Sequence, residues 1–283
     1  MTDSPLLSVR DVGIAFGGIR ALAQVSLDVP EGSIVSVIGP NGAGKTTLFN
    51  CLTGIYRPDT GSARFAEHEI LGLRPDQIAR LGLARTFQNI ELFAHMTVLD
   101  NIMLGRHRHM RAGPLSALGF GRRTRDEEVA QRRFAEQVLD FLDLHFARER
   151  FVAHLPYGVR KKVELARALA LEPRLLLLDE PSAGMNAEEK EDLVHLVRDI
   201  REEMRIAVVL VEHDMGLVMG ISDRVVVLDH GEKIAEGAPE AVTVDPVVIR
   251  AYLGTDESAQ TTLGQALRRP NAGRADAPGD AGA

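Results

Sequence analysis

The chain has 283 residues, a length that fits one large domain or a core domain with a smaller one inserted into it. Aspartate and glutamate number 40 against 33 lysines and arginines, and the formal net charge of −7 disfavours a general nucleic-acid binder, which needs excess positive charge. Hydrophobic residues make up 45% and charged residues 26%, proportions that exclude a mainly disordered chain. The single cysteine, Cys51, excludes an intramolecular disulfide and a cysteine-cluster metal site, and a reducing cytoplasm fits best.

We expect neither a secretory signal nor a membrane-spanning segment. The first residues do not combine a basic segment with a long apolar one. The longest apolar stretches, at 175–178 and 206–211, fall far short of the roughly 20 residues that a membrane helix needs. If the protein works at a membrane, other chains must span it.

The predicted elements alternate between strands and helices. Strand-like runs come first, and from 97 to 171 the pattern becomes helical, with a Gly- and Pro-containing loop or broken helix at 107–123. Further strands then alternate with helices that begin at Asn186 and Asp214. The expected strands occupy 6–16, 21–29, 33–39, 174–179, 206–211 and 224–229. This order predicts an α/β fold with a mostly parallel sheet, whose sites lie at the carboxyl ends of the strands.

A phosphate-binding loop is the clearest motif. Residues 39–47 read GPNGAGKTT and match G-x-x-x-x-G-K-[ST], directly after an apolar strand and before a helical run. Backbone N–H groups of such a loop turn toward phosphates, and the following helix adds its positive end. Lys45 would supply a cation for the β- and γ-phosphates, and the hydroxyl of Thr46 would hold Mg²⁺.

Acidic and polar residues follow two later strands. The run LLLLDE at 175–180 ends in Asp179, the expected Mg²⁺ partner, and in Glu180, which can polarise the attacking water. His213 follows the strand at 206–211 and would hold water and phosphate in line. Gln88, in RTFQN, is an amide suited to contact both Mg²⁺ and that water.

Together these motifs resemble those of ATP-binding cassette (ABC) ATPases, from about Leu7 to Gly254. The motifs occur in the family's order: Phe16, the loop at 39–47, Gln88, LPYGV at 155–159, LLLLDE, SAGMN at 182–186 and His213. The resemblance implies a P-loop cassette at 6–254 with a mostly parallel core sheet, an antiparallel β region and a helical sub-domain inserted at about 97–171. It also implies that Phe16 stacks on adenine, with Gly39, Pro40, Asn41, Gly42, Ala43, Gly44, Lys45, Thr46 and Thr47 around the phosphates.

Within that family the chain is most similar to the ATPase subunit of branched-chain amino-acid importers. FGGIRAL at 16–22, EHDMGLVMGISDRVVVLDHG at 212–231 and DPVVIRAYLG at 245–254 carry this similarity. It implies an ATP- and Mg²⁺-dependent ATPase, peripheral on the cytoplasmic side of the inner membrane. The implied partners are a second ATPase subunit that forms a homodimer or a similar heterodimer, two multi-helix permease subunits and, indirectly, a periplasmic-type binding protein. Other cargoes (urea, amides, aromatic acids or exported lipids) and a soluble non-transport module remain alternatives.

The signature motif departs from the common LSGGQ. LPYGV lacks the serine but retains a glycine and the basic helix after it. The family's two-sided nucleotide site implies that Tyr157 and the backbone around Gly158 contact the ATP of a partner subunit.

Two further segments remain to be assigned. The arginines at 106, 108, 111, 122, 123 and 125 are interpreted as a solvated loop, with contact to a membrane partner or to anionic headgroups as the alternative. The end of the chain, 255–283, becomes rich in Ala, Gly and Pro from 270 onward and is expected to be a disordered tail.

Overall fold

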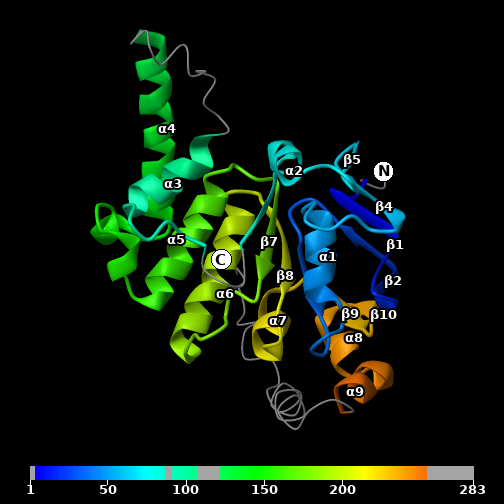
Figure 1. Ribbon diagram of the computed structural model, residues 1–283. Coiled ribbons are helices and arrows are strands. Elements are labelled where there is room, and N and C mark those ends of the chain that lie inside the picture. Colours follow the sequence, from blue (N-terminus) through cyan, green and yellow to red (C-terminus); the bar gives the residue numbers. More distant parts are fainter. Residues whose placement is uncertain (1–3, 87–90, 108–121, 254–283) are drawn as a thin grey trace, which may run out of the picture.

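The structure is a computed structural model that describes residues 4–86, 91–107 and 122–253, with 122–125 and 253 described by backbone alone. Figure 1 shows the sheets on one side of the molecule and helices α3 to α5 on the other. The strands are β1 Leu7–Phe16, β2 Ile19–Val29, β3 Ile34–Ile38, β4 Thr60–Phe65, β5 His68–Glu69, β6 Leu83–Arg85, β7 Leu175–Asp179, β8 Ala207–Val211, β9 Arg224–Asp229 and β10 Glu232–Gly237. The α-helices are α1 Lys45–Leu52, α2 Pro75–Leu81, α3 Val98–Arg106, α4 Arg122–Phe141, α5 Tyr157–Leu169, α6 Ala187–Glu202, α7 Met215–Ile221, α8 Pro239–Thr243 and α9 Pro246–Leu253.

The core sheet has the order β10-β9-β3-β8-β7-β6 among the described residues. All neighbours pair in parallel except β10, which turns back against β9. Every residue of β3, β7 and β8 is buried, as expected for strands covered on both faces. The prediction of a mostly parallel α/β core is therefore confirmed.

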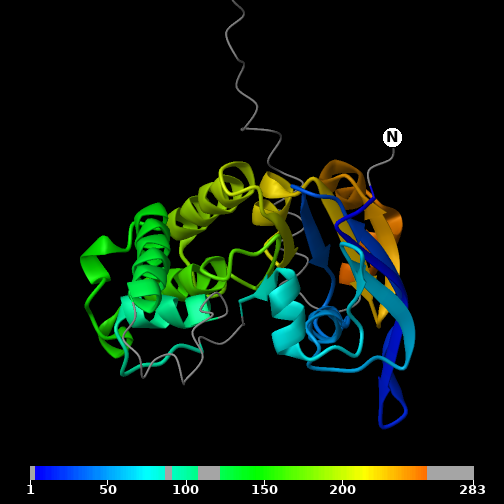
Figure 2. The same cartoon turned by 90° about the horizontal axis from the view of Figure 1, so that it is seen from above.

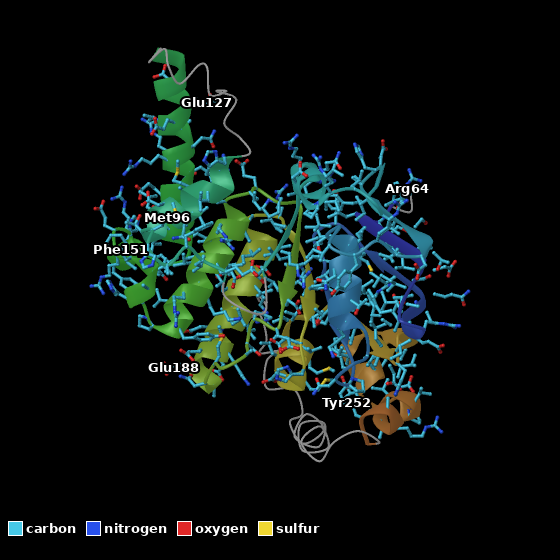
Figure 3. The ribbon with its side chains drawn as sticks, viewed as in Figure 1. Arg64, Met96, Glu127, Phe151, Glu188 and Tyr252 are labelled. Carbon is cyan, nitrogen blue, oxygen red and sulfur yellow. The ribbon has the colours of Figure 1, made fainter. Side chains whose placement is uncertain are left out.

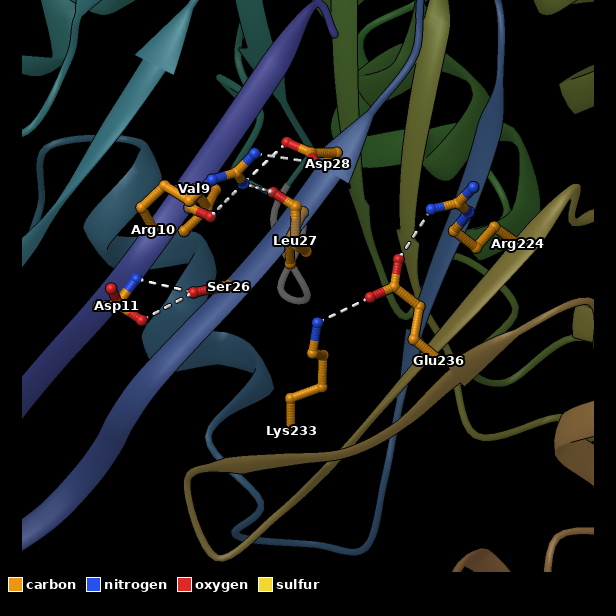
Figure 4. Close-up of polar contacts among 9 residues, drawn as sticks. All are labelled: Val9, Arg10, Asp11, Ser26, Leu27, Asp28, Arg224, Lys233 and Glu236. Atoms are coloured by element: carbon orange, nitrogen blue, oxygen red, sulfur yellow. Dashed lines mark hydrogen bonds and ion pairs between the residues drawn. The ribbon is translucent and has the colours of Figure 1, made fainter.

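A second, antiparallel sheet with the order β2-β1-β4-β5 packs beside β10. Figure 4 shows the polar contacts on these strands. Arg10 of β1 pairs with Asp28 of β2 at 2.8 Å, and Glu236 of β10 accepts hydrogen bonds from Arg224 at 2.9 Å and Lys233 at 2.7 Å. Pairs of this kind at the surface fix strand register more than they add stability.

Helices α3, α4 and α5 lie between β6 and β7 in sequence and form a lobe of their own in Figure 2. Their buried faces share one apolar cluster, which includes Ile102 of α3, Leu139 of α4 and Leu169 of α5. This cluster continues to Leu176 of β7, so the lobe is attached to the core sheet by apolar packing.

Arg106 corrects one interpretation made from the sequence. Its side chain is only 4% exposed and donates to the carbonyl oxygen of Ala170 at 2.8 Å and to Glu172 at 2.5 Å. Its Nε donates to Gln131 at 2.7 Å, so the guanidinium joins the end of α3 to α4 and to the end of α5. Arg106 is therefore a buried link within the lobe. Arg108 and Arg111 lie outside the described residues, as do the side chains of the other three arginines of this stretch.

The C-terminal helices α8 and α9 pack at the opposite end of the molecule from the lobe. In Figure 3, Tyr252 on α9 lies far from Met96 and Phe151, which belong to the helical side. Tyr252 and Val248 share an apolar cluster with Ile38, the last residue of β3. The residues expected to form a tail, 255–283, lie outside the described part.

Other expectations about the elements are confirmed with small shifts at their ends. All six expected strands form, and Asn186 and Asp214 are the N-caps of α6 and α7, where their side chains accept backbone N–H bonds. Strand β4, the short strands β5 and β6 and the edge strand β10 were not among the expected strands. None of the described helices combines the length and apolar character needed to cross a membrane.

Candidate active site

The neighbouring strands β3, β8 and β7 end at the same level in the core sheet. Val37 of β3 is the Cα partner of Val211 of β8, which in turn is the partner of Asp179 of β7. The segments that begin at Gly39, Glu180 and Glu212 therefore leave the same edge of the sheet. The register alone brings the phosphate loop, the two carboxylates and the histidine motif together.

The phosphate loop depends on two glycines with little space around them. Gly39 has a φ of +150°, and a Cβ there would lie 2.0 Å from the carbonyl oxygen of Leu228. Gly44 has a φ of +100° and caps α1, and a Cβ there would lie 2.7 Å from the carbonyl oxygen of Ala21. Any other side chain would displace the loop from β9 and β2.

The exposure of the residues varies along the phosphate loop. Gly39, Pro40, Ala43 and Lys45 are buried, Gly44 and Thr47 are half-buried, and Asn41, Gly42 and Thr46 are exposed. The first turn of α1, which the structure describes completely, carries no acidic side chain that would occupy its N–H groups. These groups can therefore bind an anion.

Lys45 is held by the loop itself. Its ammonium donates to the carbonyl oxygens of Gly39 at 2.7 Å and Pro40 at 2.9 Å, and 7% of the residue is exposed. Burial lowers the pKa of Lys45, while the nearby charges of Glu180 and Asp179 act in the opposite direction. A phosphate would be a stronger partner for this ammonium than two neutral carbonyls.

Asp179 fits a metal ligand. Its side chain is 1% exposed, and its Oδ2 accepts a hydrogen bond of 2.7 Å from Arg85. Within the described part of the chain its Oδ1 has no hydrogen-bond partner, which is costly for a buried carboxylate. A hard cation such as Mg²⁺ prefers this kind of oxygen, and Thr46 offers an exposed hydroxyl in the adjoining loop.

Glu180 adopts a backbone conformation that turns it away from the path of β7. Its φ is +47°, in the left-handed region that non-glycine residues seldom occupy. Its N–H donates to the carbonyl oxygen of Val211 at 2.9 Å, which fixes the turn against β8. Because the side chain is half-buried, its carboxylate can accept a proton from a water molecule at the sheet edge.

His213 and Glu212 occupy the end of β8 with opposite exposure. The His213 side chain is 62% exposed, whereas that of Glu212 is wholly buried. Glu212 accepts backbone hydrogen bonds from Ser182 at 2.8 Å and from His213 at 3.1 Å. Glu212 was not among the residues predicted from the sequence, although a carboxylate directly after an apolar strand is a signal that could have found it.

Phe16 lies at the end of β1 and is 45% exposed. Its ring meets that of Tyr56 edge to face, with centroids 5.1 Å apart. Tyr56, which was not predicted from the sequence, thereby packs against Phe16. The exposed part of the Phe16 ring can still stack on a base.

Tyr157 and Gly158 begin α5, away from the phosphate loop. Figures 1 and 2 show α5 and α1 on opposite sides of β7 and β8. Tyr157 is 43% exposed, and a Cβ at Gly158 would lie 3.2 Å from Oε1 of Glu189. The chain therefore does not bring this motif to its own Lys45. Gln88 lies outside the described residues.

Comparisons with known proteins agree with this geometry. A family model described as ABC transporter matches residues 22–183, and one described as branched-chain amino acid ATP-binding cassette transporter matches 232–258. The chain is 44% identical over 250 residues to the high-affinity branched-chain amino acid transport ATP-binding protein BraF of Pseudomonas aeruginosa, covering 88% of this chain and 98% of BraF. It is 42% identical over 254 residues to LivG of Escherichia coli, a protein of the same description, with the same coverage. A crystal structure of an ATP-binding cassette of an ABC transporter in its ADP conformation matches with a TM-score of 0.77 and 31% identity, covering 88% of this chain and 99% of the other.

Proposed function

The chain belongs to the ATP-binding cassette family of transporter ATPases, and from this premise we propose that it powers the import of branched-chain or related small amino acids. In this proposal residues 6–254 form one cassette, with the helical sub-domain at about 97–171. ATP binding and hydrolysis by the cassette drive movements of membrane partners.

One observation carries the proposal: the loop after β3, the carboxylates after β7 and the histidine after β8 leave the same edge of the core sheet. We assign Lys45 and the N–H groups of the loop to the β- and γ-phosphates, and Phe16 to the adenine. Glu180 accepts the proton of the attacking water. His213 holds the γ-phosphate, and Gln88 orients the water.

The metal proposed for this site is Mg²⁺, which when bound neutralises phosphate charge during transfer. Asp179 and Thr46, with Gln88, would hold it. The buried Oδ1 of Asp179 supports this assignment, because it lacks a hydrogen-bond partner among the described residues.

A second ATPase subunit completes the site in this proposal. Helix α5, which begins at Tyr157, lies across β7 and β8 from α1, which begins at Lys45, so we assign the start of α5 to the nucleotide bound by a partner. Two multi-helix permease subunits would bind the dimer on the cytoplasmic side of the inner membrane, and a periplasmic-type binding protein would deliver the cargo. The ABC family membership supports this assembly.

The cargo assignment is supported by the family match at 232–258 and by relatives that are named for branched-chain amino acid transport. The test is to co-produce the chain with its membrane partners, reconstitute the complex in vesicles and measure ATP hydrolysis with each candidate cargo and the binding protein. Stimulation by leucine, isoleucine or valine is expected. Stimulation by urea or short amides alone would reject the cargo, and failure to assemble with any membrane partner would reject the transport role.

A further inference from the structure

A buried arginine lies beside the carboxylate assigned to Mg²⁺. Arg85 is the last residue of β6, and its Nη2 donates to Oδ2 of Asp179 at 2.7 Å. The two side chains are 6% and 1% exposed, so this ion pair is shielded from water and from salt. It differs in this respect from the surface pairs of the antiparallel sheet.

The same guanidinium also contacts the helix that follows the phosphate loop. Its Nη1 donates to Oδ1 of Asn50 on α1 at 2.6 Å, and the guanidinium carbon lies 5.5 Å from the centroid of the Phe49 ring. Arg85 therefore connects three elements of the site: β6, the end of β7 and α1. Its fork has a fixed, planar shape, so these contacts also fix the orientation of the Asp179 carboxylate.

The two carboxylate oxygens of Asp179 consequently have different roles. Arg85 occupies Oδ2, while Oδ1 is buried and lacks a hydrogen-bond partner within the described chain. The side chain can then offer a single oxygen to a cation. Contacts that orient a metal ligand in this way commonly change metal affinity about 10-fold to 100-fold when they are removed.

We propose that Arg85 is a positioning residue for Mg²⁺: by holding Oδ2 of Asp179 and the side chain of Asn50, it aims Oδ1 of Asp179 at the metal beside the phosphate loop. This inference rests on the proposed function, because it assumes that Asp179 binds Mg²⁺ together with ATP. It concerns the affinity for the metal, whereas the loop residues set the affinity for the nucleotide itself.

The experiment measures binding of a non-hydrolysable ATP analogue to the full-length chain by calorimetry, in EDTA and across a range of Mg²⁺ concentrations. The variants are Arg85→Lys, which keeps the charge but loses the fork, and Arg85→Gln. Arg174→Gln is the matched control, because Arg174 also pairs with a carboxylate, that of Glu31, but at the surface. Mn²⁺ binding followed by electron paramagnetic resonance gives a second readout at the metal.

For both Arg85 variants we expect wild-type affinity in EDTA and a half-saturating Mg²⁺ concentration raised about tenfold or more. Arg174→Gln should match the wild type in both. In an Asp179→Asn background, Arg85→Lys should cause no further change, because the amide keeps one oxygen to accept from Arg85 and presents an NH2 group, which cannot bind a cation, in place of Oδ1. If Arg85→Gln fails to fold, Arg85→Lys and the double variant decide the question.

The results separate this inference from the proposed function. A wild-type chain that does not bind the Mg²⁺-nucleotide overturns both. Wild-type binding together with an unchanged Mg²⁺ requirement in Arg85→Lys overturns the role of Arg85 alone. Equal weakening of binding in EDTA and in Mg²⁺ also overturns it, because that result indicates damage to the nucleotide pocket.

Discussion

The buried carboxylate of Glu212 accepts a hydrogen bond of 2.8 Å from the backbone N–H of Ser182 and thereby ties the end of β8 to the loop that follows Glu180. The same side chain accepts the N–H of His213 at 3.1 Å. One wholly buried carboxylate thus sets the spacing between the segments that carry the proposed base and the proposed phosphate-holding histidine. Within the described part of the chain it has three backbone donors, the third being the N–H of Asp214 at 3.4 Å, and these hydrogen bonds offset much of the cost of burying its charge.

Glu212→Gln should lower both stability and turnover. The amide nitrogen of glutamine cannot accept an N–H bond, so at least one of the backbone donors loses its partner, at a cost of about 2 kcal/mol. Because the loop glycines and Lys45 are untouched, ATP affinity should stay the same while kcat falls. Chemical denaturation and steady-state hydrolysis measure the two effects, with the exposed Glu232→Gln as control. Wild-type kcat in Glu212→Gln would contradict the proposed link.

Glu180→Gln should leave nucleotide binding intact and slow hydrolysis by about a hundredfold or more, because the amide cannot accept a proton from water. The closed, ATP-bound dimer should then accumulate, which size-exclusion chromatography with light scattering detects. Glu188→Gln is a suitable control, since Glu188 is exposed on α6 and labelled in Figure 3. Normal turnover in Glu180→Gln would remove Glu180 from the role of base.

Much of this site could be predicted because its residues follow short strands that are mostly apolar. The runs that became β3, β7 and β8 are buried along their whole length, and each motif begins where its strand ends. A parallel sheet brings such ends to one edge, so the phosphate loop, Asp179, Glu180 and His213 could be grouped from the sequence.

The supporting contacts could not be predicted, because they join positions far apart in the chain. Arg85 and Asp179 are separated by 94 residues, and Ser182 and Glu212 by 30. The burial of Arg106 depends on partners at the end of α5, and its charge in an arginine-rich stretch suggested a solvated loop instead. The left-handed φ of Glu180 likewise has no signal in the sequence, because non-glycine residues seldom adopt it.

Gly158→Asp should abolish ATP-dependent dimerisation while leaving nucleotide binding by the single chain unchanged. A Cβ at this position would lie 3.2 Å from Oε1 of Glu189, so the new carboxylate would sit beside an existing one and place negative charge at the N-terminal end of α5. That charge repels the triphosphate bound by the partner. Light scattering in a Glu180→Gln background measures the dimer.

Gly158→Ala is the matched control for this prediction. It adds the same Cβ without charge, so most of the dimerisation should remain. Loss of the dimer in both variants would point to crowding against Glu189 as the cause, and unchanged dimerisation in Gly158→Asp would count against the two-sided nucleotide site.

The burial of the Cys51 thiol leads us to expect that the free energy of unfolding depends on pH in the alkaline range. The thiol is fully buried in α1, and burial raises its pKa from the ordinary value of 9.0 to about 11. Above pH 9 the unfolded chain therefore releases a proton that the folded chain retains until about pH 11. The contribution of this thiol to stability is complete below pH 9 and then falls by about 1.4 kcal/mol per pH unit.

Denaturation of the wild type and of Cys51→Ala across this range tests that contribution. The difference in free energy of unfolding between the two should be constant below about pH 8 and should shift against the wild type as the pH rises from 9 to 11. Taking the difference removes the titration of tyrosines and lysines, which both proteins share. Alkylation gives an independent measure, since a buried, protonated thiol should react only when α1 opens. Rapid alkylation of the native protein at about pH 8 would show that the thiol is accessible. A difference in free energy of unfolding that stays constant up to pH 11 would show that the thiol ionises with its ordinary pKa.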